Sequence, residues 1–276
     1  MKKITLAVLF LSFITNLFAQ EVKKIDDLNY IATYSMVHQV NAKNEASKVE
    51  EKMFLLIGSK MSKYQSENRY LKDSISIHHF KNNTEASPQE YMLLPTTYQI
   101  YTIIKNRDTE TMTTNEDVMV ENLEYEQPMS DIKWEIQNES MKISGYMCQK
   151  ATLSYGGRDF VAWFTNQIPV NEGAYKFAGL PGFLVNISDT QNQSVIQLTS
   201  ITKNTDKEKA IYRVEGKRKT ITTTREKFMQ TKEKSTKTSV LDNFEASGMT
   251  VTFDDPKVME EMRKKKYKIY NPIELK

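Results

Sequence analysis

The segment Arg158–Thr165, with the sequence RDFVAWFT, constrains the fold more than any other part of the chain. In a strand, successive side chains point to opposite faces, so Phe160 and Phe164 share one face while Val161 and Trp163 share the other. A strand that is apolar on both faces needs cover on both. We expect the sheet core on one side. On the other side three alternatives stay open: a helix from the C-terminal third, an apolar cavity or groove, or an exposed face for a partner.

Further strand-like segments, rich in β-branched and aromatic residues, lie on both sides of Arg158–Thr165. Ile132, Trp134 and Ile136 alternate with polar residues, as in a strand with one solvent-facing side, and a turn is predicted at Asn138–Glu139. Because the connections are short, antiparallel hairpins are favoured over βαβ units. The predicted strands cover residues 30–37, 53–57, 98–104, 111–120, 132–137, 141–147, 158–165, 182–188 and 194–201.

Helix signals are concentrated in the last third of the chain. Thr223 and Glu226 form a capping-box pattern ahead of Phe228, so we expect a helix to begin there. Pro256 predicts the start of a second helix, which ends in the basic run Arg263–Lys268. This run fits a solvated helix C-terminus, with contact to anionic lipid headgroups or to an acidic partner surface as the alternative.

The fold class that these patterns predict is mainly β, within the α+β class. We expect a strongly curved antiparallel sheet with helical additions, chiefly C-terminal, packed into its concave face. At residues 60–80 the strand pattern weakens and predicts a helical turn or two. No internal repeat and no Pro- or Gly-rich linker divides the chain. We therefore predict one domain over residues 20–276, with a signature core at 132–189 and a helical, basic part at 205–276.

The stretch Gly179-Leu180-Pro181-Gly182 predicts a tight turn. Proline presets the φ angle wanted at the second position of a β-turn, and glycine accepts the positive φ of the third position in a type II turn. We therefore expect a positive φ at Gly182, and a close backbone approach at Gly179. The alternative is a rigid loop whose backbone N–H groups face a ligand. It is not a phosphate loop, because no Gly-Lys-Ser/Thr sequence follows.

The residues around this turn resemble those of a known family. The segment Ile132–Asp189, which ends in FAGLPGFLVNISD, is similar to the GLPGLI family, whose name spells its signature. This chain has Ala174 where the family usually has proline, and Phe183-Leu184 where it has Leu-Ile, and both changes keep the apolar character. The resemblance implies an exported protein of a Gram-negative bacterium. The family has no established function, so the resemblance implies no catalytic residues.

The N-terminus has the anatomy of a secretory signal peptide. Lys2 and Lys3 form a positive n-region, Ile4–Phe13 forms an apolar h-region, and Ala19 offers a small residue for cleavage. The apolar run is too short for a comfortable membrane span, and no later run reaches the roughly twenty residues that a span requires. We expect removal of residues 1–19, no integral span afterwards, and a location in the periplasm, the cell envelope or the secreted fraction. An uncleaved anchor is the alternative.

Charge and cysteine content argue against two broad classes of protein. The chain carries a formal net charge of +3, and the loss of Lys2 and Lys3 with the signal peptide leaves +1. A nearly neutral protein gives no support to nucleic-acid binding. Cys148 is the only cysteine, so no internal disulfide forms. Its position in a predicted strand indicates a buried, inert thiol.

Patterns for catalysis or metal binding are weak. The three histidines, His38, His78 and His79, have no cysteine cluster beside them, which favours surface histidines over a metal site. No Gly-x-Ser-x-Gly motif marks a serine hydrolase. Glu172 and Asp189 lie near the signature, but their spacing matches no acid–base pattern, and Asp189 fits a turn residue. We therefore predict no catalytic residue, no metal and no cofactor.

The function that the sequence predicts is binding without catalysis. We expect an exported cell-envelope protein that binds an apolar ligand, a peptide or an envelope protein partner, and no nucleic acid. The residues expected to form or frame the site are Phe160, Trp163, Phe164, Gly179, Leu180, Pro181 and Gly182. Two alternatives stay open: an envelope enzyme, such as a hydrolase without a recognisable motif, and a structural accessory of an outer-membrane assembly.

Overall fold

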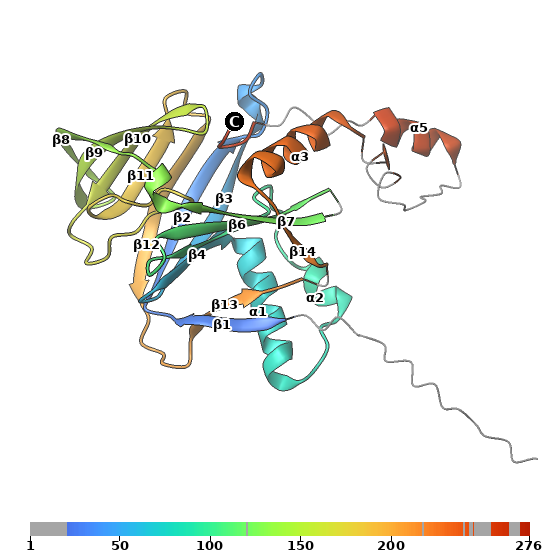
Figure 1. Cartoon of the computed structure of the whole chain (residues 1–276), viewed down its shortest axis with the longest axis horizontal. Coiled ribbons are helices and arrows are strands. Elements are labelled where there is room, and N and C mark those ends of the chain that lie inside the picture. Colours follow the sequence, from blue (N-terminus) through green and yellow to red (C-terminus); the bar gives the residue numbers. More distant parts are fainter. Residues whose placement is uncertain are drawn as a thin grey trace, which may run out of the picture.

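The fold is that of a computed structural model of the chain, drawn in Figure 1. The structure describes residues 21–119, 121–216, 218–239, 241–242, 245, 255–264 and 271–276. The predicted signal peptide lies outside the described residues, and so does the basic run from residue 265 onward. In the described part, no helix combines the length and the apolar character that crossing a membrane requires.

A large antiparallel sheet forms the body of the protein (Figure 1). Over the described residues its strand order is β14-β7-β6-β5-β4-β3-β2-β12-β11-β10-β9-β8, with β14 and β7 parallel and the other neighbours antiparallel. A separate antiparallel pair joins β1 (Val22–Asp27) to β13 (Ala210–Val214). The mainly β, antiparallel fold class predicted from the sequence is confirmed. The strands of the large sheet are β2 (Tyr30–Gln39), β3 (Lys48–Ile57), β4 (Met61–Ser66), β5 (Tyr101–Asn106), β6 (Thr111–Val118), β7 (Glu121–Pro128), β8 (Glu135–Ile143), β9 (Tyr146–Tyr155), β10 (Arg158–Thr165), β11 (Phe183–Asp189), β12 (Ser194–Lys203) and β14 (Thr220–Thr222).

The helices begin close to the predicted positions in the last third of the chain. The capping hydrogen bond of α3 is accepted by Thr224 and not by Thr223, so this helix starts one residue later than the capping-box pattern predicts. α5 begins at the predicted Pro256. At residues 60–80 the predicted helical structure is present but is longer than the predicted turn or two, because α1 is a 16-residue helix. Only Ser76 of α1 is buried, and a helix that buries so little needs no apolar stripe. The sequence of α1 therefore lacks the apolar periodicity that would reveal its full length. The described helices are α1 (Glu67–Asn82), α2 (Pro88–Met92), α3 (Arg225–Lys237) and α5 (Pro256–Lys264), with short 3-10 turns η1 (Glu45–Ser47) and η2 (Met129–Asp131).

The β8–β9 hairpin corrects the turn predicted at Asn138–Glu139. β8 continues through these residues with a register shift between Ile136 and Ser140, and the chain does not reverse there. It reverses at Ser144 and Gly145, whose φ angles are 49° and 89°. Two consecutive residues of positive φ suit the twist of a tight antiparallel hairpin. The turn is therefore set by a glycine that accepts this conformation, and the polar pair in the strand is a local irregularity.

The large sheet curls strongly, as Figure 1 shows. Eight strands separate β7 from β9 in the sheet order. Even so, Gln127 Nε2 of β7 donates a hydrogen bond of 3.0 Å to the Tyr155 hydroxyl of β9. The two strands reach each other across the concave face of the sheet. This face carries the main apolar core, to which Tyr34, Tyr64 and Phe183 contribute.

The concave face is filled mainly by irregular chain. Residues 166–182 contribute Phe177 and Leu180 to the core, and residues 271–276 contribute Ile273. One helix joins them: α3 packs on β6 and β7 at the end of the sheet. The sequence predicts that helices fill the concave face. Among the helices that pack on the described strands, only α3 does so. Segments without regular structure fill most of the face.

The convex face is covered by regular elements. α1 packs against β3 and β4 and against the β1–β13 pair. A small apolar cluster of Leu28, Leu56 and Ile211 lies between these layers, with Tyr70 of α1 beside it. The expectation that helices pack into the concave face is thus wrong for α1.

β10 has the two apolar faces that its sequence predicts, but they are covered unequally. Phe160 and Phe164 lie in the concave core with 2% and 1% of their surface exposed. Val161 and Trp163 are half-buried on the other side. The predicted helical cover over this second face is wrong for the described helices, because α1 packs on β1, β3, β4 and β13 and α3 packs on β6 and β7.

Candidate functional site

In the signature turn at residues 179–182, the two glycines have exchanged the roles that the sequence predicts for them. Gly179 has a φ of 89°, a conformation that favours glycine, and a Cβ there would have no neighbour closer than 3.9 Å. Gly182 does not have a positive φ, but a Cβ there would lie 2.7 Å from the Thr165 carbonyl oxygen and 2.6 Å from Asn166 Oδ1. The predicted positive φ at Gly182 is therefore wrong. The close backbone approach expected at Gly179 occurs at Gly182.

The residues predicted to form or frame a ligand site are spread between core and surface. The buried ones are Phe160, Phe164, Leu180 and Gly182, the half-buried one is Trp163, and the exposed ones are Gly179 and Pro181. The lining of the two cavities described below includes none of them. Phe160, Phe164 and Leu180 belong to the concave core, whereas Trp163 lies on the other face of β10. The role of all seven residues in ligand binding stays a prediction.

A buried ionic cluster holds residues 166–182 in the concave core. Glu172 accepts hydrogen bonds from Lys105 Nζ at 2.6 Å and from Arg107 Nη2 at 2.8 Å. Lys105 Nζ also donates to the Gly173 carbonyl oxygen at 2.5 Å. Burial alone would raise the pKa of Glu172, but the charges of Lys105 and Arg107 lower it below its ordinary value. The ionised carboxylate therefore ties the irregular segment to β5.

A second buried cluster holds the C-terminal segment 271–276. Glu274 lies against the Lys176 ammonium and accepts hydrogen bonds from the Tyr175 hydroxyl at 2.5 Å and from Arg225 Nη2 at 2.7 Å. The Lys176 ammonium also contacts a tyrosine hydroxyl of β7. Burial opposes ionisation of Glu274, but the charge of Lys176 and these hydrogen bonds lower its pKa to about 2. One carboxylate thus joins the C-terminal segment, the irregular loop and α3.

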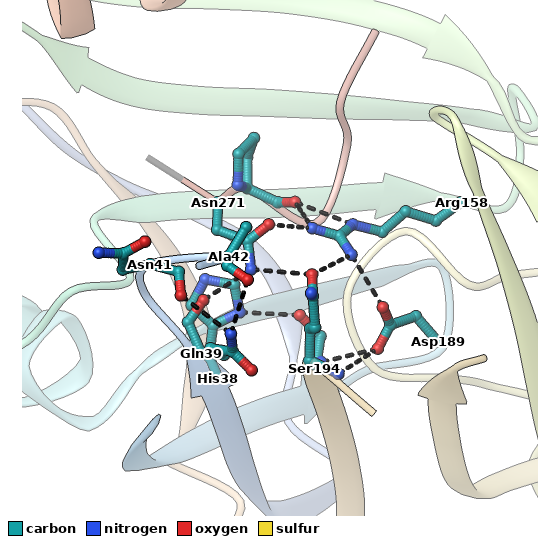
Figure 2. A network of polar contacts seen from close by, with 10 residues as sticks. His38, Gln39, Asn41, Ala42, Arg158, Asp189, Ser194 and Asn271 are labelled. Atoms are coloured by element: carbon teal, nitrogen blue, oxygen red, sulfur yellow. Dashed lines mark hydrogen bonds and ion pairs between the residues drawn. The ribbon is translucent and has the colours of Figure 1, made fainter. Parts of the chain in front are cut away.

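A third cluster, shown in Figure 2, anchors the start of the same segment. Arg158 Nη1 donates to Asp189 Oδ2 at 2.8 Å, and Arg158 Nη2 donates to Asn271 Oδ1 at 2.5 Å. The other Asp189 oxygen accepts from the backbone N–H groups of Gln193 and Ser194, at 2.7 and 2.8 Å. Asp189 is therefore the turn residue that the sequence predicts. It also neutralises a buried guanidinium.

Between these clusters the concave face contains a cavity of about 580 Å³. Its walls come from β2 and β5–β7, from the loops beside them, from α3 and from the C-terminal segment. A cavity of this size, lined by aromatic side chains and a few polar groups, is typical of small-molecule sites. The aromatic lining residues are Tyr98, Tyr101, Tyr125, Tyr175 and Phe228.

The charged groups that line this cavity are paired with one another. Lys232 Nζ of α3 lies 2.7 Å from Glu116 Oε2 of β6, and Lys176 is paired with Glu274 as described above. His38 also lines the cavity; burial and the nearby guanidinium of the third cluster lower its pKa to about 4, so it is neutral at neutral pH. The described lining therefore offers aromatic faces and neutral hydrogen-bonding groups to a ligand.

One contact at the edge of the cavity has the form of a nucleophile and its base. His38 Nδ1 lies 2.7 Å from Ser194 Oγ. Both residues are buried, with 6% and 3% of their surface exposed, and only His38 lines the cavity. A histidine whose pKa is about 4 accepts a proton weakly at neutral pH. The contact is best explained as a bond between the paired strands β2 and β12.

The remaining candidates from the sequence give no chemical site. Cys148 is buried, as predicted, and burial raises the pKa of its thiol. His79 Nε2 is 3.0 Å from Glu90 Oε1, a contact that links α1 to α2. Within the ranges that the structure describes, no three His, Cys, Asp or Glu side chains are grouped as metal ligands.

Sequence reasoning missed the buried charges that shape the cavity. Lys176 offers a signal, because it directly precedes the apolar run of the signature and shares its burial. Arg158 offers another, at the start of a strand that is apolar on both faces. Glu274 lies near the C-terminus, 98 residues from Lys176, and nothing in the local pattern connects the two. Their pairing becomes visible only in three dimensions.

Comparisons with known proteins match part of the chain to a family. Residues 154–186, from the end of β9 through the signature turn into β11, match the model of a family described as "Protein of unknown function (Porph_ging)". No curated protein matches the chain.

Two solved structures match part of the chain. "Structure of PNGF-II in C2 space group" is 16% identical, with a TM-score of 0.47 over 76% of this chain and 33% of that one. "Structure of PNGF-II in P21 space group" is 15% identical, with a TM-score of 0.47 over 76% of this chain and 34% of that one. This chain thus spans about a third of the length of these structures.

Proposed function

We propose that this chain is an exported, non-catalytic binding protein of the cell envelope, and that its ligand occupies the cavity on the concave face. Export rests on the signal-peptide pattern of residues 1–19 and on the resemblance to the exported GLPGLI family. The observation that carries the binding function is the preformed cavity of about 580 Å³. Its walls are held by the buried clusters around Glu274 and Arg158, and a rigid site loses little conformational entropy when it binds.

The ligand that this lining suits is a small uncharged molecule with apolar surface. Tyr101, Tyr175 and Phe228 present aromatic rings, while the charges at the wall already form ion pairs. A charged ligand would have to displace one member of such a pair, and removing one partner of a buried pair is costly. An uncharged ligand gains apolar contact without that cost.

The test uses a larger side chain on α3 to reduce the volume of the cavity. Met229 lines the cavity, whereas the next residue, Gln230, is exposed and is not part of the lining. The uncharged fluorophore N-phenyl-1-naphthylamine is titrated into the purified wild-type protein and into the Met229→Trp and Gln230→Trp variants. We expect saturable binding by the wild type and by Gln230→Trp, and at least about tenfold weaker binding by Met229→Trp, a loss of about 1.4 kcal/mol. Equal affinity of the two variants would contradict the proposal.

A hydrolase is the second candidate, and the contact between His38 and Ser194 is the observation in its favour. The two functions predict different effects of Ser194→Ala on fluorophore binding and ester turnover. In a binding protein this variant keeps the affinity for the fluorophore and shows no loss of turnover on ester substrates. In a hydrolase that uses this pair, ester turnover by the wild type disappears in the variant while the fold is unchanged.

A further inference from the structure

A second cavity, of about 600 Å³, opens on the convex face of the sheet. It is lined by residues of α1, by residues beside and within α2, by the outward side chains of β5–β7, and by residues of β13 and β14. Figure 1 shows α2 beside α1 and close to β14. This cavity lies on the face opposite the proposed ligand site and is independent of it.

Part of the charge in this cavity is neutralised within the protein. Lys63 Nζ lies 2.6 Å from Asp73 Oδ2. Arg213 lies 2.8 Å from a Glu124 oxygen and 3.0 Å from a Glu215 oxygen. These contacts account for two of the lining cations and three of the lining acids.

The remaining lining charges are unbalanced. Arg69, Lys72 and Arg218 are cations, and Asp117 is the one acid left to them in the described lining. Asp117 already accepts a hydrogen bond of 3.0 Å from Asn122 Nδ2. Lys72 and Arg218 are exposed. Taken together, five cations and four acids line the cavity in the described part, so the lining carries a net charge of +1, and Lys72 and Arg218 are the cations accessible from outside.

Arg69 is held in place but incompletely bonded. Its Nε donates to the Ile100 carbonyl oxygen at 2.7 Å, which fixes the guanidinium at the cavity wall. Its buried Nη2 forms an ion pair with Asp117 Oδ2 at 3.6 Å, which is beyond hydrogen-bond distance, and it has no hydrogen-bond partner among the described atoms. A guanidinium nitrogen that lacks a hydrogen-bond acceptor, close to two exposed cations, suits an additional anionic oxygen as its acceptor.

The rim of the same cavity carries exposed apolar side chains. Met92 and Leu93 are consecutive at the end of α2, with 80% and 87% of their surface exposed, the highest values among the large hydrophobic residues of the described chain. The flanking Tyr91 and Leu94 line the cavity. Exposed apolar side chains beside cations are the combination with which peripheral proteins bind lipid surfaces.

We propose that this cavity and α2 form a docking site for an anionic phospholipid surface. The headgroup phosphate binds to Arg69, Lys72 and Arg218, and Met92 and Leu93 enter the boundary between headgroups and acyl chains. Charge complementarity selects the anionic surface, and the apolar pair distinguishes a membrane from a free phosphate ester.

The test is co-sedimentation with vesicles. The wild-type protein is expected to bind vesicles of phosphatidylglycerol and phosphatidylethanolamine, to bind phosphatidylcholine vesicles much less, and to lose affinity as salt increases. Since each cation near an anionic surface contributes about fivefold, we expect the exposed double variant Lys72→Gln/Arg218→Gln to bind about 25-fold more weakly. Met92→Ser/Leu93→Ser is expected to bind more weakly with an unchanged salt dependence.

Matched controls come from the far end of the sheet. Lys142→Gln and Met147→Ser change an exposed cation and an exposed apolar residue of the β8–β9 hairpin, and both are expected to bind like the wild type. Wild-type affinity in the Lys72→Gln/Arg218→Gln variant would overturn the proposal, and so would equal binding to phosphatidylcholine. A melting-temperature shift with glycerol phosphate in a protein that binds no vesicles would also overturn it, in favour of a free phosphate site.

Discussion

The two faces of the sheet are covered by different kinds of chain. On the convex face, α1 and the β1–β13 pair form their own backbone hydrogen bonds, and Ile211 of β13 packs in one apolar cluster with Leu56 of β3. On the concave face, residues 166–182 and 271–276 have no regular structure. Buried backbone groups without such a structure need other partners, and side chains supply them.

This difference explains where the buried charges lie. Lys105, Lys176 and Arg158 point into the concave core, and each hydrogen-bonds to a residue of an irregular segment. Charged groups form stronger hydrogen bonds than neutral ones, but each becomes costly once its partner is lost. We therefore expect the concave face to be more sensitive than the surface to the removal of a single charge, and to be sensitive to acid.

The largest expected effect is the loss of the Glu274 carboxylate. Glu274→Gln leaves the Lys176 ammonium buried without an anionic partner, so we expect the free energy of unfolding to fall by about 3–5 kcal/mol. The matched control is Glu139→Gln, which removes an exposed pair with Lys150 and is expected to cost less than about 1 kcal/mol. Urea unfolding at pH 7 measures both. Similar losses in the two variants would show that the buried charges do not hold the concave segments.

The next effect is acid destabilisation through His38. Its pKa is about 4 in the folded protein and 6.5 when unperturbed, so the unfolded chain binds a proton that the folded protein excludes. Stability is therefore full above pH 6.5 and declines as the pH falls toward about 4, by about 3 kcal/mol in all. The Glu274 carboxylate acts in a lower window, because its pKa falls from 4.5 to about 2. Urea midpoints measured between pH 7 and pH 4.5 separate the two groups.

A substitution of His38 tests whether this histidine causes the loss of stability in acid. His38→Gln keeps a hydrogen-bonding side chain beside Ser194 but has no group that titrates, so the decline between pH 6.5 and 4.5 is expected to disappear. The control is His78→Gln, which changes an exposed histidine of α1 and is expected to keep the wild-type pH dependence. If His38→Gln loses stability with acid as steeply as the wild type, another group is responsible.

Much of the fold follows from short-range sequence patterns. Segments rich in β-branched and aromatic residues, such as Arg158–Thr165, predict the strands, and Pro256 marks the start of α5. The patterns fail at turns, where the φ angles of single residues determine the path of the chain. The turn at Gly145 and the exchanged roles of the two signature glycines depend on φ angles and on contacts between segments, which composition does not encode.

The cavities are harder to predict than the strands for a physical reason. Their walls combine side chains that are far apart in the sequence, as in the contact of His38 with Ser194 and of Lys176 with Glu274. Local periodicity identifies which residues share a face of a strand, but it does not identify which strands face each other across a curled sheet. Charged residues inside apolar stretches, such as Lys176, are the one signal available beforehand.

The smallest expected effect compares the two signature glycines. Gly182 lies where the irregular segment rejoins the sheet, and a Cβ there would press on the Thr165 carbonyl oxygen at 2.7 Å. We expect Gly182→Ala to cost about 2 kcal/mol, because backbone must move. Gly179→Ala meets no close atom but forces a positive φ on alanine, for about 1 kcal/mol. Thermal unfolding of both variants tests this order. A larger loss at Gly179 would mean that backbone strain within the segment, and not its fit against β10, limits the packing of the concave face.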